Sequence, residues 1–457
     1  MKNSSAAFFE IFFLVFVASF FLTLGVDLRD QLYLRLWLGG ILSAVFFIFF
    51  QKESPASKDL TVLCFFSFLG FILIRFLGTV FLIIKAGNLT PDRLLLFPQY
   101  LYSPFRWSFY FVFFLLSFCF FRTKARVHHL LWTLAGTGFF LAINAIPPFL
   151  LKGEASYLAG DGQMVYFHPL FYSCEVLSKY VFGRFSFINY VGDLIALGFF
   201  PAWGLFFREW DLWRQEKETK HLILFVTAAF FCAATALGVV LFLSRGTLIC
   251  FFWALIVYLF TAFLKFPSRS QSLGVAVSLF LVLVVLFSTG TLKKGWNEIR
   301  TLQTESEKTK ESISTNREGA RRAVRIYLSH PLLGVGTEGY LNFSLRYGSP
   351  KPAGESHPSW VMADHKAMCH YLQVLAEEGI GAFFYFLFLL AYFFESIRGF
   401  FKTKSRFQFI SSLSLFAPVF MVLSHAAINH LMQQFSISIL TYIFMGATLA
   451  LFRPDFE

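Results

Sequence analysis

The stretch SRGTLICFFWALIVYLF at residues 244–260 decides the fold class, because after Arg245 it contains no charged side chain. The apolar run that starts there continues to residue 264. A helix needs roughly 20 mostly apolar residues to cross the hydrocarbon core of a bilayer. The stretch therefore predicts a membrane-spanning helix that begins at a lone arginine.

The rest of the chain repeats this pattern. Of its 457 residues 57% are hydrophobic, 14% are charged and 66 are phenylalanine, which is more apolar surface than one soluble core can bury. Comparable runs lie near residues 7–26, 33–50, 60–84, 106–121, 130–150, 190–207, 221–243, 247–264, 273–290, 376–395, 408–424 and 433–452. The predicted fold class is all-α, a polytopic transmembrane helical bundle of about 12 spans, with one long periplasmic loop that contains short helices.

Lysine and arginine concentrate in alternate short connections, and such connections face the cytoplasm. This pattern predicts cytoplasmic N- and C-termini, and the organisation 1–290 (spans 1–9), 291–373 (long periplasmic loop) and 374–457 (spans 10–12). A net charge of +12 would suggest nucleic acid in a soluble protein. Here about half of the basic residues are explained by the topology, so the predicted partner is the lipid bilayer and not nucleic acid.

The long loop contains two helical patterns separated by a turn. NREGARRAVRIYLS at 316–329 predicts a helix with Asn316 as its N-cap. Its predicted apolar arc consists of Ala320, Val324, Tyr327 and Leu328, and beside it Arg317, Arg321 and Arg325 recur every four residues. HPLLGVGTEGY at 330–340 then predicts a turn. The pattern of 364–378 is helical again and is expected to run into the tenth span.

Arginines on the predicted outer side indicate an anionic ligand, because the guanidinium fork matches phosphate oxygens. Two other interpretations stay open. Arg245 can be an interfacial anchor of its span, and the row from Arg317 can be a solvated helix face. Histidines gather on the same predicted side, where a neutral imidazole near arginines can act as a general base. They are His168, His330, His357, His365, His370, His425 and His430.

The order of these motifs resembles the O-antigen ligase and O-antigen polymerase-like family of bacterial envelope enzymes. The resemblance rests on SRG at 244–246, HPLLGVGTEGY at 330–340 and YLQVLAEEGIGA at 371–382, with Asn189 of GRFSFINYVGDL in a further family position. It implies a metal-independent glycosyltransferase without a cofactor, acting at the periplasmic face of the bacterial inner membrane on an undecaprenyl-diphosphate-linked glycan. By position, Arg245 and Arg317, joined by Arg321 of the same row, would neutralise the leaving diphosphate.

The expected base is where this sequence departs from the family. Members often carry His-Asn or His-Ser eleven residues before the glycine of the E-x-G turn, but the corresponding positions before Gly379 are Met368 and Cys369. His370 and His365 are the nearest histidines. His370 is favoured as the base because it is tied to the following helix. In the alternative interpretation both are ordinary loop histidines.

The acceptor distinguishes two enzymes. A ligase transfers the glycan to lipid A-core, which is the interpretation we favour, and a polymerase transfers it to a second lipid-linked glycan. A non-enzymatic transporter or flippase of lipid-linked saccharides is the alternative from another class. Transporters usually place ionisable groups in repeated spans, whereas the predicted spans here contain few such groups, chiefly Glu10, Arg35, Arg75 and Asp193.

Cys174 and Cys369 both fall in predicted outer loops, where they can form a disulfide or remain two thiols.

Overall fold

The computed structural model describes residues 2–22, 59–85, 91–152, 156–158, 164–166, 188–241, 245–265, 306–336, 339–347, 367, 369–429, 432, 435–454 and 456. Its first helices are α1 (Lys2–Leu22), α3 (Leu60–Lys85), α4 (Pro91–Phe120), α5 (Lys124–Lys152), α7 (Ile188–Glu216), α8 (Thr219–Leu241) and α9 (Arg245–Lys265). They are followed by α12 (Ser306–Ser329), α13 (Tyr340–Tyr347), α15 (His370–Glu378), α16 (Gly381–Lys402), α17 (Arg406–Ala426) and α18 (Phe435–Ala450). A hairpin of β1 (Ser156–Leu158) and β2 (Met164–Tyr166) departs from the all-helical prediction.

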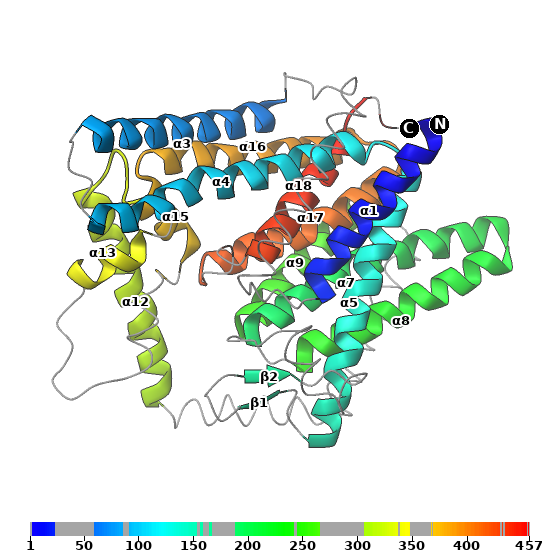
Figure 1. Cartoon of the computed structure of the whole chain (residues 1–457). Coiled ribbons are helices and arrows are strands. Elements are labelled where there is room, and N and C mark those ends of the chain that lie inside the picture. The colour runs from blue at the N-terminus through cyan, green and yellow to red at the C-terminus, as the bar shows by residue number, and fades with distance from the viewer. Residues whose placement is uncertain are drawn as a thin grey trace.

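Long apolar helices confirm a multi-pass membrane protein. Among the described residues, α3, α8, α9, α16 and α17 each contain a stretch long and apolar enough to cross a bilayer. The predicted spans near 33–50 and 273–290 lie outside the described residues, so the count of about 12 spans stays a prediction. Figure 1 shows the start of α1 and the end of α18 at the same end of the bundle, in keeping with two termini on one side.

Close helix crossings at small residues hold the bundle together. A Cβ added at Gly198 of α7 would lie 2.6 Å from the Cα of Gly138 in α5. Similarly, a Cβ at Gly446 of α18 would lie 2.2 Å from the carbonyl oxygen of Phe114 in α4. Packing at small residues is a main source of helix association in lipid, where burial of apolar side chains gives little advantage.

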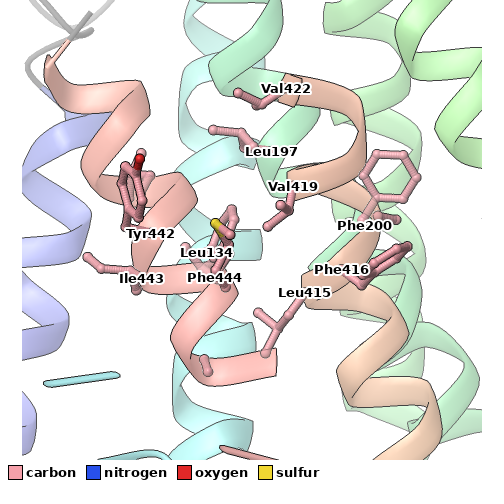
Figure 2. Close-up of a cluster of buried hydrophobic side chains, with 14 of the residues drawn as sticks. Leu134, Leu197, Phe200, Leu415, Phe416, Val419, Val422, Tyr442, Ile443 and Phe444 are labelled. Carbon is pink, nitrogen blue, oxygen red and sulfur yellow. The ribbon is translucent and has the colours of Figure 1, made fainter. Parts of the chain in front are cut away.

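A buried layer of large apolar side chains fills the space between these crossings. Figure 2 shows residues of α5, α7, α17 and α18 that point toward one another, namely Leu134, Leu197, Phe200, Leu415, Phe416, Val419, Val422, Tyr442, Ile443 and Phe444. Helix α17 is the most enclosed of the candidate spans, since 78% of its apolar window is buried. It is therefore a central helix, and what it carries at its ends is held rigidly.

A smaller unit lies across one end of the bundle. Helices α12, α13 and α15 share a second hydrophobic core, formed by Ala323, Ile326, Val335, Tyr340, Ala367 and Ala376. Figure 1 shows α12 running across the end of α3, α4 and α16, and not along them.

Three details of the predicted loop are wrong. Helix α12 begins at Ser306, so Asn316 lies inside the helix and is not its N-cap. Leu328 of the predicted apolar arc is 68% exposed, because the helix packs through Ala323 and Ile326 on another side. Helix α15 ends at Glu378, and a turn separates it from α16.

Candidate functional site

The HPLLGVG turn is joined to the end of α15 by main-chain hydrogen bonds. The N–H of Val335 donates to the carbonyl of Ala376 at 3.1 Å, and the N–H of Gly336 donates to the carbonyl of Glu377 at 2.9 Å. These bonds fix the turn that follows α12 against the end of α15. Two motifs that are separate in the sequence therefore form one rigid structural element.

Two glycines allow this approach. Gly334 and Gly379 have φ values of +64° and +58°, in the left-handed region that favours glycine. A Cβ at Gly334 would lie 2.2 Å from the carbonyl oxygen of Glu377, and one at Gly379 would lie 2.5 Å from the nitrogen of Gly334. Glycine at both motif positions is thus a requirement of backbone conformation and of space.

A buried ion pair anchors this element to the bundle. Nη1 of Arg75 in α3 lies 2.5 Å from Oε2 of Glu378, and it also donates to the carbonyls of Glu377 at 2.9 Å and Leu333 at 3.1 Å. Nε1 of Trp107 in α4 donates to the other carboxylate oxygen of Glu378 at 3.2 Å. One arginine inside a predicted span therefore holds both motif segments.

A small pocket lined by both polar and apolar side chains lies beside His370, the first residue of α15. It is lined from α4, α15, α18 and the preceding turn by Arg106, Trp107, Tyr110, His370, Gln373, Val374, Glu377, Met432, Ser438 and Tyr442. Its volume of about 20 Å³ is enough for one water molecule or one hydroxyl group, and too small for a sugar ring. Arg106 is held on its wall by Nε donating to Tyr110 Oη at 2.8 Å and Nη2 donating to the carbonyl of Met432 at 3.2 Å.

His370 is buried in this wall and is uncharged near neutral pH. Its Nε2 lies at hydrogen-bond distance, 3.2 Å, from Oη of Tyr385 in α16, while its Nδ1 has no hydrogen-bond partner among the described residues. Burial, with a smaller contribution from the cation of Arg106, lowers the pKa of His370 from 6.5 to about 3. The predicted base is thus a neutral imidazole with one buried ring nitrogen that has no hydrogen-bond partner among the described residues.

The predicted row of arginines on α12 is exposed. Arg317 and Arg321 face solvent and have no ion-pair partner in the described part of the chain. Their neighbour Arg322 is only 2% exposed and binds Glu318 through Nε at 3.1 Å. Arg317 and Arg321 are therefore free to meet an external anion. Arg325, by contrast, donates through Nη1 to the carbonyl of Tyr347 at 2.9 Å, and Arg322 is bound inside the fold.

The Ser-Arg-Gly motif lies against a buried pair that the sequence did not predict. Arg245 begins α9, and a Cβ at the next residue, Gly246, would lie 2.4 Å from Nε2 of His425 in α17. Nδ1 of His425 lies 3.0 Å from both carboxylate oxygens of Asp193 in α7. The signal for this pair was an ionisable residue inside an apolar span, but the 232 positions that separate the two residues concealed their contact.

The other predicted residues lie in less informative places. His365 and Cys174 are outside the described residues, and Cys369 has no disulfide partner among the described cysteines, so the pairing of Cys174 with Cys369 stays a prediction. Asn189 lies in the first turn of α7. Arg106 was also missed, because a single arginine at the edge of an apolar run resembles an interfacial anchor.

One group of side chains in the described part of the chain has the spacing of metal ligands, and it is remote from this site. The ligand atoms of Glu216, Glu218 and His221 lie within 4.8 Å of one another, with both glutamates exposed. Glu216 is at the opposite end of α7 from Asp193, roughly 35 Å away along the helix. These residues are therefore separate from the pair of His425 and Asp193.

Part of the chain matches a known family. Residues 228–387 match the family model described as O-antigen ligase. This confirms the resemblance seen in the sequence. The matched range contains Arg245, α12, the HPLLGVG turn and α15, but neither Arg106 nor His425. None of the curated proteins compared with the chain matches it.

Proposed function

We propose that this protein, whose residues 228–387 match the O-antigen ligase family model, transfers a glycan from undecaprenyl diphosphate to lipid A-core at the periplasmic face of the inner membrane. The observation that carries the proposal is that the matched range includes His370, a buried neutral histidine that lines a small pocket and has one ring nitrogen without a hydrogen-bond partner among the described residues. The family match supports membrane glycosyltransferase activity, and the donor, the acceptor and the membrane face are the finer parts of the proposal.

The proposed chemistry is a direct displacement. The acceptor hydroxyl enters the pocket and gives its proton to His370 while its oxygen attacks the anomeric carbon of the donor. The bond from that carbon to the diphosphate oxygen breaks, and undecaprenyl diphosphate leaves. Arg245, with Arg317 and Arg321 from the exposed row, neutralises the charge that develops on it. No metal is assigned to this step.

The lowered pKa of His370 fits a general base that becomes effective only when the donor substrate is bound. An imidazole with a pKa of about 3 is neutral at neutral pH but a weak proton acceptor. An anionic diphosphate bound nearby favours the protonated ring, and so raises the pKa. His370 would thus gain basicity when the donor is in place, and Arg106 would orient the acceptor.

The glycan profile of a deletion strain tests the function. An intact core with accumulated long lipid-linked polymer is expected for a ligase. A single repeat unit on the core would instead show a polymerase. Loss of lipid-linked glycan from the periplasmic side would show a transporter and overturn the proposal.

Substitutions test the residues. We expect His370→Ala to reduce glycan transfer by at least about 100-fold, the usual contribution of a general base, while His365→Ala and the double variant show whether His365 shares the role. His129→Ala, an exposed histidine of α5, is the matched control. Full transfer by the double His365/His370 variant would refute the assignment of the base.

Arginine chemistry is tested by Arg245→Lys. Lysine keeps the charge and loses the planar pair of donors, so we expect weaker donor binding in this variant. Unchanged activity would show that Arg245 acts only as a positive charge.

A further inference from the structure

We propose that the buried pair of His425 and Asp193 is a positioning element, which fixes the first turn of α9 and therefore Arg245 for binding of the donor diphosphate. The proposal rests on the proposed function and adds two residues outside the matched range 228–387. It also assigns a structural role to Asp193, an acidic residue inside an apolar span.

The pair is built as a rigid support. The side chains of His425 and Asp193 are 1% and 0% exposed, and Nδ1 of the ring is equidistant, at 3.0 Å, from both carboxylate oxygens. Such an arrangement holds the imidazole by its Nδ1–H and fixes the orientation of the ring. Burial of a carboxylate within a span is costly unless it is paired, and so this contact also ties α17 to α7.

The other side of the ring contacts α9. Nε2 and Cδ2 of His425 occupy the space where a side chain at position 246 would begin, at 2.4 and 3.0 Å from an added Cβ. Only glycine accepts the ring this closely. Since Arg245 directly precedes Gly246, the orientation of the ring determines where the backbone of Arg245 lies.

The same end of α17 is connected to the pocket. Oη of Tyr371 in α15 donates to the carbonyl of Leu423 at 2.7 Å, two residues before His425. The pair is therefore joined on one side to the motif that carries the diphosphate arginine, and on the other to the helix that carries His370. A displacement of His425 should affect the donor end of the site first.

Binding and kinetics of the full chain in lipid nanodiscs test this role. The variants are Asp193→Asn, which keeps the shape and removes the charge, and Gly246→Ala, which displaces the ring. We expect each to raise the Kd for undecaprenyl diphosphate and the donor KM by about tenfold or more, because small displacements of a binding group have large effects. The acceptor KM should stay unchanged, which a general loss of structure would not produce. Gly70→Ala is the matched control, since an added Cβ there meets nothing within 4 Å.

The double variant Gly246→Ala/His425→Ala distinguishes two causes of weak donor binding, namely loss of the positioning role of the pair and a steric clash between the new methyl group and the ring. It removes the ring that the new methyl group would meet, so recovery of donor binding would show that the pair is not needed and would overturn the proposal. Continued weak binding supports it. Donor binding by Asp193→Asn equal to that of the wild type would also overturn it. If the wild-type protein neither binds undecaprenyl diphosphate nor transfers glycan, the proposed function fails as well.

Discussion

Replacement of Arg75 by methionine should destabilise the protein by breaking the buried ion pair that joins the motif segments to α3. Arg75 and Glu378 are 8% and 1% exposed, and their charged atoms lie 2.5 Å apart. Removing one partner of a buried pair costs about 3–5 kcal/mol, because the other charge stays buried. That is a large fraction of the roughly 5–15 kcal/mol that stabilises a typical fold.

The second substitution, Glu378→Gln, removes the stranded charge and keeps an oxygen for Trp107. The double variant Arg75→Met/Glu378→Gln should therefore be more stable than Arg75→Met alone, with a coupling energy of about 1.5–3 kcal/mol. Unfolding in mixed detergent, with increasing dodecyl sulfate, measures the free energies of all four proteins. Arg398→Met is the control, since Arg398 lies exposed on α16. A coupling energy below about 0.5 kcal/mol would refute the argument, because sites without an interaction are additive within that range.

Two further outcomes follow from the burial of His370 and from the close crossing of α5 and α7. The unfolded chain protonates His370 near its ordinary pKa of 6.5, whereas the folded chain does so only at about 3. Stability should therefore fall as the pH decreases below about 6.5, by at most about 1.4 kcal/mol per pH unit, and an equal slope in His370→Gln would contradict this. Gly198→Ala places a Cβ 2.6 Å from Gly138 and should cost about 1–3 kcal/mol. Gly70→Ala should cost far less, and equal unfolding midpoints for the two variants would count against the close crossing.

The helices of the bundle could be predicted because their signal is local. Continuous apolar runs near 408–424 and 433–452 correspond to α17 and α18 within a few residues. The loop helices were harder, since α12 begins in the polar residues before 316, and its buried face contains the ion pair of Arg322. A buried charged residue interrupts the apolar periodicity by which the buried face of a helix is recognised in a sequence.

The site could be predicted only in part. The turn at 330–340, Arg245 and His370 were visible because each sits in a recognisable local pattern, and the structure brings the turn and α15 into direct contact. Their partners were not visible. Arg75, Arg106 and Asp193 are single polar residues in apolar runs. Each forms a hydrogen bond with a residue that is far away in the sequence.

The charged residues inside the spans are paired for the same physical reason. In lipid an isolated charge inside a helix is costly, so an arginine or aspartate in a span must find a partner on another helix. Arg75 finds Glu378 at the end of α15, and Asp193 finds His425 beside the start of α9. In both cases the partner adjoins a motif within the range 228–387 that matches the O-antigen ligase family model. These two ion pairs therefore connect the helices of the bundle to the motifs that carry the proposed site residues. Variants at the four paired positions should alter glycan transfer, although none of the four side chains is assigned to touch the substrate.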